Sequence, residues 1–65
     1  MTGKVKTHMV DKGYGFIKAD EDGSEYFFHI SNCESNFTEL KPGRRVQFES
    51  VPSAKGKRAE NVVLL

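Results

Sequence analysis

Lys12-Gly13-Tyr14-Gly15-Phe16-Ile17 is the stretch that decides the fold, and Tyr26-Phe27-Phe28-His29-Ile30 follows it after a short interval. Both stretches read as β-strands. Side chains alternate between the two faces of a strand, so the tyrosine and phenylalanine of the first stretch share one face, as do Phe27 and His29 of the second. If the strands pair, four flat rings lie side by side near several lysines. Because bases stack on rings and ammonium groups neutralise phosphates, this pattern predicts binding of single-stranded nucleic acid.

The chain is short and nearly neutral. Its 65 residues predict a single domain over residues 1–65, and folding at this size buries only ~60% of the unfolded surface, which leaves little room for a catalytic cavity. Ten Lys+Arg against nine Asp+Glu give a net charge of +1, so attraction for polyanions depends on where the charges lie. With one cysteine, Cys33, and no long apolar run, we expect a cytoplasmic protein without an internal disulfide or membrane span.

Turn-forming residues divide the chain into short strands with almost no helical periodicity. Asp22-Gly23 predicts a tight hairpin turn, and Pro42-Gly43 predicts a type II turn. Such a series of short strands, without room for crossover helices, predicts an all-β fold, a small five-stranded antiparallel barrel. The expected strands span residues 4–10, 12–18, 25–30, 45–51 and 59–65. Residues 31–39 are expected to form a loop with at most one helical turn, and residues 52–58 a mobile basic loop.

The aromatic face has two interpretations. Tyr14, Phe16 and Phe27 are either core residues, the commoner fate of aromatics on an alternating strand, or an exposed platform. The opposite strand faces already supply a core and the chain has no helices to cover a second one, so we expect the platform. Gly13 and Gly15, on the face behind the rings, indicate strong bending or close approach of another backbone. The expected core residues are Val5, Ile17, Tyr26, Phe28, Val46, Phe48, Val62 and Leu64.

The order of the two aromatic strands separates two nucleic-acid-binding folds. Residues 12–17 match the start of the RNP1 motif, which in an RNA recognition motif comes after the RNP2 strand and intervening elements. Here the first aromatic strand lies near the start of the chain and its partner follows it. The order therefore favours an OB-type barrel over an RNA recognition motif.

At this point the chain resembles the bacterial cold-shock domain family from end to end. The resemblance implies binding of single-stranded RNA and DNA, preferring pyrimidine-rich stretches, by an RNA chaperone or a regulator of transcription or translation. We expect a monomer. The matching segments are residues 3–6, the RNP1-like residues 11–17, the RNP2-like residues 27–31, and Phe37, Leu40, Gly43, Val46, Gly56, Ala59, Asn61 and Val62.

The resemblance also implies roles for individual residues. Lys6 and Lys12 would meet the sugar–phosphate backbone, and Lys55 stands where the family often carries a basic contact. The residues implied to stack with bases are Tyr14, Phe16, Phe27, His29 and Phe37.

The chain departs from the family pattern at the first strand. Thr7-His8-Met9 stands where the family usually has Trp-Phe-Asn, Ile30 replaces a common phenylalanine, and the chain has no tryptophan. Each stacked base contributes ~1–3 kcal/mol, so lost rings weaken binding. His8 as a stacking imidazole, and Lys57 and Arg58 as added phosphate partners, offer compensation. We therefore predict weaker and more salt-sensitive binding than in a relative with the tryptophan.

Other chemistry finds little support in the sequence. We expect no catalytic residue, because His29 has no serine or cysteine nucleophile at a readable spacing. His8, His29 and Cys33 do not form a zinc-binding spacing, so we expect neither metal nor cofactor. One alternative function stays open: with Thr7 in the tryptophan position, the barrel could be an interaction module that contacts a protein partner or itself. The retained rings favour nucleic-acid binding.

Overall fold

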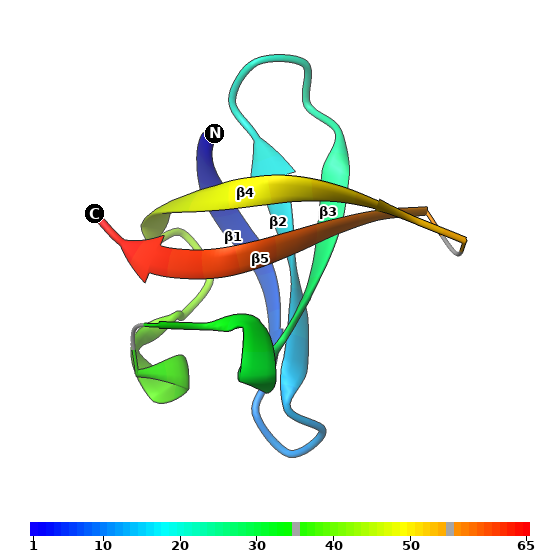
Figure 1. Cartoon of the computed structure of the whole chain (residues 1–65). Helices are drawn as coiled ribbons and strands as arrows, with labels where there is room; N and C mark the ends of the chain where they lie inside the picture. The colour runs from blue at the N-terminus through cyan, green and yellow to red at the C-terminus, as the bar shows by residue number, and fades with distance from the viewer. Residues whose placement is uncertain (35, 55) are drawn as a thin grey trace.

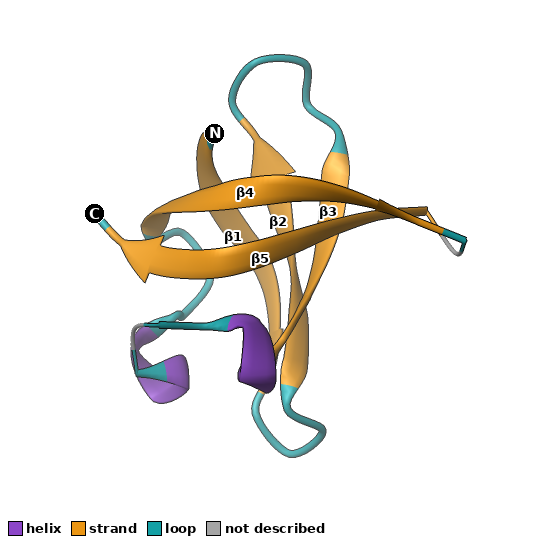
Figure 2. Cartoon of the chain, in the orientation of Figure 1, coloured by secondary structure: helices purple, strands orange, loops and turns teal. Residues whose placement is uncertain are grey.

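The computed structural model describes residues 1–34, 36–54 and 56–65. Within them, five strands close into a barrel in the order β1-β2-β3-β5-β4 (Figure 1). All strand pairs are antiparallel except the short parallel contact between β3 and β5. The expected all-β barrel is therefore confirmed. The elements are β1 (Thr2–Met9), β2 (Tyr14–Ala19), β3 (Glu25–His29), the 3-10 turns η1 (Ile30–Asn32) and η2 (Phe37–Glu39), β4 (Arg45–Ser53) and β5 (Gly56–Leu64) (Figure 2).

The barrel interior holds the side chains that strand alternation predicted. Leu64 is the exception, since it is half-buried and packs at the margin of the core. Phe37 and Leu40 join the core from η2 and the residue after it, so the segment between β3 and β4 closes one end of the barrel. The buried hydrophobic residues are Val5, Ile17, Ala19, Tyr26, Phe28, Phe37, Leu40, Val46, Phe48, Ala59 and Val62.

A β-bulge in β1 changes which side chains face outward. Val5 is the partner of Ile17 but Thr7 is the partner of Phe16, so Lys6 is the extra residue. Thr7 therefore lies on the outer face with Phe16, and the next residue, His8, lies opposite buried Gly15 on the inner side. Strict alternation from an inward Val5 gives the opposite orientation for both residues.

Gly15 allows the first two strands to approach closely, as its position behind the rings predicted. A Cβ at this position would collide with the Thr7 carbonyl oxygen and would lie 2.8 Å from the Phe28 ring. The two predicted turns are also present. Gly23 and Gly43 have φ values of +73° and +92°, which side chains other than glycine rarely adopt.

The expected mobile loop at residues 52–58 is wrong. β4 continues through Pro52 to Ser53, β5 begins at Gly56, and the two strands pair to their ends. Figure 1 shows this hairpin reaching beyond β3. Proline cannot donate a hydrogen bond to a neighbouring strand, so it is excluded only from strand positions that need this N–H. The hairpin accommodates Pro52 opposite Lys57. Lys57 and Arg58 are consequently placed on a strand.

Candidate nucleic-acid interface

Tyr14, Phe16 and Phe27 form a cluster of three half-buried rings on the outer face of β2 and β3, hereafter the ring cluster. The register places Phe16 opposite Phe27, and Tyr14 opposite His29. The ring centroids of Tyr14 and Phe27 are 5.5 Å apart, and those of Phe16 and Phe27 are 5.8 Å apart. The three rings therefore lie on the outer face as expected, each partly exposed, and they support one another by tilted and edge contacts.

His29 continues the outer face of β3 and is exposed. Its ring is fixed by Ser31, whose backbone N–H donates to Nδ1 at 3.2 Å and whose hydroxyl lies 2.9 Å from the same atom. Because Nδ1 accepts this hydrogen bond, the proton of the neutral imidazole is on Nε2. The free edge of His29 is thus a hydrogen-bond donor beside the ring cluster. Nothing in the sequence motif pointed to Ser31 as the residue that orients it.

His8 and Phe37 lie apart from the ring cluster. Phe37 is only 6% exposed and packs on Phe28, with ring centroids 5.9 Å apart. His8 Nε2 donates to the Phe37 carbonyl oxygen at 2.8 Å, and the two rings are 4.7 Å apart. His8 has this position because the bulge in β1 turns its side chain towards the inside of the barrel. In this conformation Phe37 is buried and offers no exposed stacking face, whereas His8 is half-buried and turned towards Phe37.

A hollow of about 540 Å³ lies beside the ring cluster. Phe16 and Phe27 form one wall, and the end of the β4–β5 hairpin forms the other. Its volume falls within the range of small-ligand pockets, which makes it large enough for a nucleobase. The sequence pattern did not indicate Ser53 and Ala54, because their place beside the rings depends on the length of the hairpin. The hollow is lined by Phe16, Phe27, Ser53, Ala54, Lys57 and Arg58.

Three of the expected phosphate partners, Lys6, Arg58 and Lys57, lie beside carboxylates of the same chain. Lys6 Nζ lies 2.6 Å from Glu25, and Arg58 Nη2 lies 2.7 Å from Glu60. The Lys6–Glu25 pair is exposed, and the Arg58–Glu60 pair is partly buried. Exposed ion pairs contribute little to stability, so the Lys6–Glu25 pair can exchange for a phosphate. Arg58 Nε is buried and, within the described residues, has no hydrogen-bond partner.

Lys57 is held at the β2–β3 hairpin. Its Nζ donates to Ser24 Oγ at 2.9 Å, lies 4.0 Å from Asp22, and is 5.5 Å from the centre of the Tyr26 ring. The pKa of Asp22 is held below its ordinary value, first by hydrogen bonds from Ser24 and then by the charge of Lys57. Lys57 therefore faces an ionised carboxylate at neutral pH.

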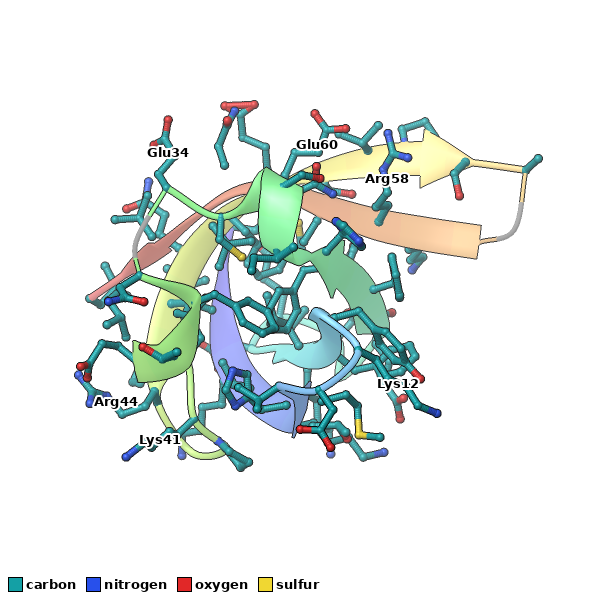
Figure 3. The ribbon with its side chains drawn as sticks, turned by 90° about the horizontal axis from the view of Figure 1, so that it is seen from below. Lys12, Glu34, Lys41, Arg44, Arg58 and Glu60 are labelled. Carbon is teal, nitrogen blue, oxygen red and sulfur yellow. The ribbon has the colours of Figure 1, made fainter. Side chains whose placement is uncertain are left out.

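Lys12 is exposed, and none of the ion pairs among the described residues involves it. Figure 3 shows Lys12 at a different edge of the molecule from Arg58 and Glu60. The cations available for phosphate thus flank the ring cluster on separate sides. Lys55 lies outside the described residues.

The remaining chemistry of the described residues is limited. They contain no group of three or more histidine, cysteine, aspartate or glutamate side chains that could hold a metal ion. No helix in the described part of the chain is long and apolar enough to cross a membrane.

The fold and this face define a small barrel with an exposed aromatic strand surface, and the comparisons with known proteins specify its family. The model of the "'Cold-shock' DNA-binding domain" matches residues 1–65. The chain is 41% identical over 66 residues to the cold shock-like protein CspC of Bacillus cereus, covering 100% of both chains. It is 41% identical to the cold shock-like protein CspE of Escherichia coli K12, covering 97% of this chain and 93% of the relative. The chain belongs to the cold-shock domain family, which is a nucleic-acid-binding family.

Proposed function

We propose that this protein binds single-stranded RNA and DNA by stacking bases on the ring cluster. The observation that carries the proposal is the exposed face of Tyr14, Phe16 and Phe27, which borders a hollow containing Lys57 and Arg58. Flat rings accept any base, while the neighbouring cations neutralise phosphates. His29 adds a donor from Nε2. Lys6 and Lys12 contact the sugar–phosphate backbone, the former after release from Glu25.

Binding is expected to be weaker than in relatives with a tryptophan in the first strand. Thr7 stands beside Phe16 on the outer face and offers no ring. Phe37 adds a stacking surface only if η2 moves, because its ring is packed on Phe28 and His8. The predicted salt sensitivity requires Lys57 and Arg58 to exchange their own carboxylates for phosphate.

The biological role we propose is that of a cytoplasmic RNA chaperone or a regulator of transcription or translation. A monomeric, non-enzymatic protein that holds pyrimidine-rich single strands is suited to both tasks. Pyrimidine preference fits a platform that reads stacking and backbone flexibility rather than base edges.

The experiment that tests binding replaces the rings. Phe16→Ala and Phe27→Ala each remove a stacking surface worth about 1–3 kcal/mol, so affinity for labelled oligothymidine should fall about 5- to 150-fold. The measurement is fluorescence anisotropy, with circular dichroism to establish folding. Leu65→Ala is the matched control, since this side chain is exposed at the C-terminus. Folded variants that bind as well as the wild type would contradict the proposal.

A second candidate is an interaction module that contacts a protein partner or itself. The observation in its favour is an apolar surface beside the β1–β2 turn, where Met9, Val10 and Ile30 are 36%, 52% and 48% exposed. The Ile30 N–H donates to the Gly13 carbonyl oxygen, which holds this surface together. A wild-type protein that binds no single strand at any salt concentration would favour this second function.

A further inference from the structure

Two lysines face each other on neighbouring strands beyond the ring cluster. Lys4 on β1 and Lys18 on β2 are partners in the antiparallel register, and both are exposed. Arg45 on β4 is the partner of Lys4 on its other side. Three cations therefore lie in one row across β4, β1 and β2. Glu25 on β3 is the partner of Lys18 on its other side, but its carboxylate is paired with Lys6. Like charges directly opposite one another destabilise a sheet, so the pairing of Lys4 with both Lys18 and Arg45 is not explained by the interactions of the fold.

The chain neutralises one member of the row. Asp20 accepts hydrogen bonds from Arg45 Nη2 at 2.6 Å and from Thr2 Oγ1 at 3.0 Å. None of the ion pairs among residues 1–34, 36–54 and 56–65 involves Lys4 or Lys18. An open hollow of about 360 Å³ lies between these two lysines and Asp20. Since Arg45 already balances the Asp20 carboxylate, the two ammonium groups remain available to an anion.

The row lies on the same face of β2 as the ring cluster. Tyr14, Phe16 and Lys18 alternate outward along this strand, so Lys18 lies about 7 Å beyond Phe16 on an extended backbone. The distance is short for a flexible single strand. The ring cluster and the lysine pair therefore share one face of β2, with the rings first and the lysines beyond them.

The Lys6–Glu25 ion pair crosses this surface. Lys6 is the bulged residue of β1 beside Phe16, Glu25 on β3 is the partner of Lys18, and β2 lies between them. The pair therefore spans the outer face of β2 between the rings and the lysine row, with a separation of 2.6 Å. The Glu25 carboxylate occupies the position where a strand running from rings to lysines would place a phosphate.

We propose that Lys4 and Lys18 form a second phosphate-binding site, reached by a single strand that continues from the ring cluster along β2. The strand displaces Glu25 from Lys6 and places backbone phosphate between the two lysines. The occupant is the sugar–phosphate backbone of the strand already stacked on the rings, because the two surfaces match its bases and its charge in sequence. This inference rests on the proposed function and extends its footprint to the end of β2.

The test compares two oligothymidines, one of about four nucleotides that covers the rings alone and one of about eight that reaches the lysine row. The variant is Lys4→Gln/Lys18→Gln. Its matched control is Lys41→Gln/Arg44→Gln, which removes the same charge from exposed residues that lie together at an edge remote from Lys12 (Figure 3). Affinity is measured by anisotropy as a function of salt, and thermal unfolding establishes that each variant folds.

Each lost phosphate contact lowers the log–log salt slope by about 0.7. With the longer strand, the salt slope of the lysine variant should be smaller than that of the wild type by about 1.4, because two phosphate contacts are lost. When salt is raised from about 50 to about 200 mM, the affinity of the wild type should therefore fall about sevenfold more than that of the variant. With the shorter strand the two proteins should behave alike. A lysine variant that keeps the wild-type slope on the longer strand, or a control variant that loses as much, overturns the inference while the proposed function stands. A wild type that binds neither strand overturns the proposed function itself.

Discussion

Thr7 stands where the family usually has a tryptophan, and among the departures from the family pattern this one affects the expected binding most. The bulge at Lys6 turns the Thr7 side chain outward beside Phe16, so the position is ready for a stacking ring that the chain does not provide. His8, which the sequence offers as a substitute, is instead bonded to the Phe37 carbonyl oxygen. One bulged residue therefore decides which of two adjacent side chains can meet a base.

Thr7→Trp should tighten binding of oligothymidine. A fourth ring beside Phe16 adds a stacked base worth about 1–3 kcal/mol, or a factor of about 5 to 150 in affinity. Titration of the variant by tryptophan fluorescence quenching and by anisotropy measures the gain. Thr38→Trp, an exposed position on η2, is the control and should leave affinity unchanged. Equal affinity of the Thr7 variant and the wild type would show that this position does not meet the nucleic acid.

Cys33 should react slowly with alkylating reagents at neutral pH. Its partial burial raises the pKa of the thiol to about 11, and Sγ donates to the His29 carbonyl oxygen at 3.4 Å. Because the thiolate is the nucleophile, the alkylation rate should rise with pH up to about 11. The same group favours the folded state below pH about 9, and this contribution is lost as pH rises towards 11. An alkylation rate that levels off near pH 9, as expected for an unfolded chain, would contradict the raised pKa of Cys33.

At the scale of elements, the β4–β5 hairpin is the part that adds most to the candidate interface. Its length carries Arg58 to a position opposite Phe27 and builds the second wall of the hollow beside the ring cluster. The same strand supplies Glu60, which pairs with Arg58. The hairpin thus places Arg58, a phosphate partner, next to Glu60, a carboxylate that competes with phosphate for the same guanidinium group.

Glu60→Gln should strengthen binding and steepen its salt dependence. Removing the carboxylate frees the Arg58 guanidinium for phosphate, and one added contact raises the log–log salt slope by about 0.7. Glu34→Gln is the matched control, because it removes the same charge from an exposed residue that takes part in none of the ion pairs among the described residues and lies away from Arg58 (Figure 3). Salt titrations of oligothymidine binding compare the three proteins. Unchanged slope in the Glu60 variant would mean that Arg58 does not reach the phosphates.

At the scale of the whole molecule, charge is arranged so that a nearly neutral chain can present cations around its rings. The carboxylates of Asp22, Glu25 and Glu60 face Lys57, Lys6 and Arg58, and only the Arg58–Glu60 pair among these three is partly buried. A bound strand would replace several of these carboxylates together. Binding therefore depends on the exchange of internal ion pairs for phosphates as much as on the net charge of the protein.

The sequence by itself determined the barrel, most of its core and the exposed rings. Period-2 alternation around Phe16 and Phe27 is a local property, and the turns at Gly23 and Gly43 follow from backbone preferences of single residues. These features depend on residues that are close together in the sequence, so they can be predicted without knowing the tertiary contacts.

The tertiary structure decided the rest. The bulge at Lys6, the burial of Phe37, the extension of the hairpin through Pro52 and the pairing of Arg58 each depend on which strands meet and in what register. Residues far apart in the chain fix these features, because side-chain direction and ion pairing respond to neighbours across the barrel. Local sequence therefore predicted the rings, and only the closed barrel determined which residues surround them.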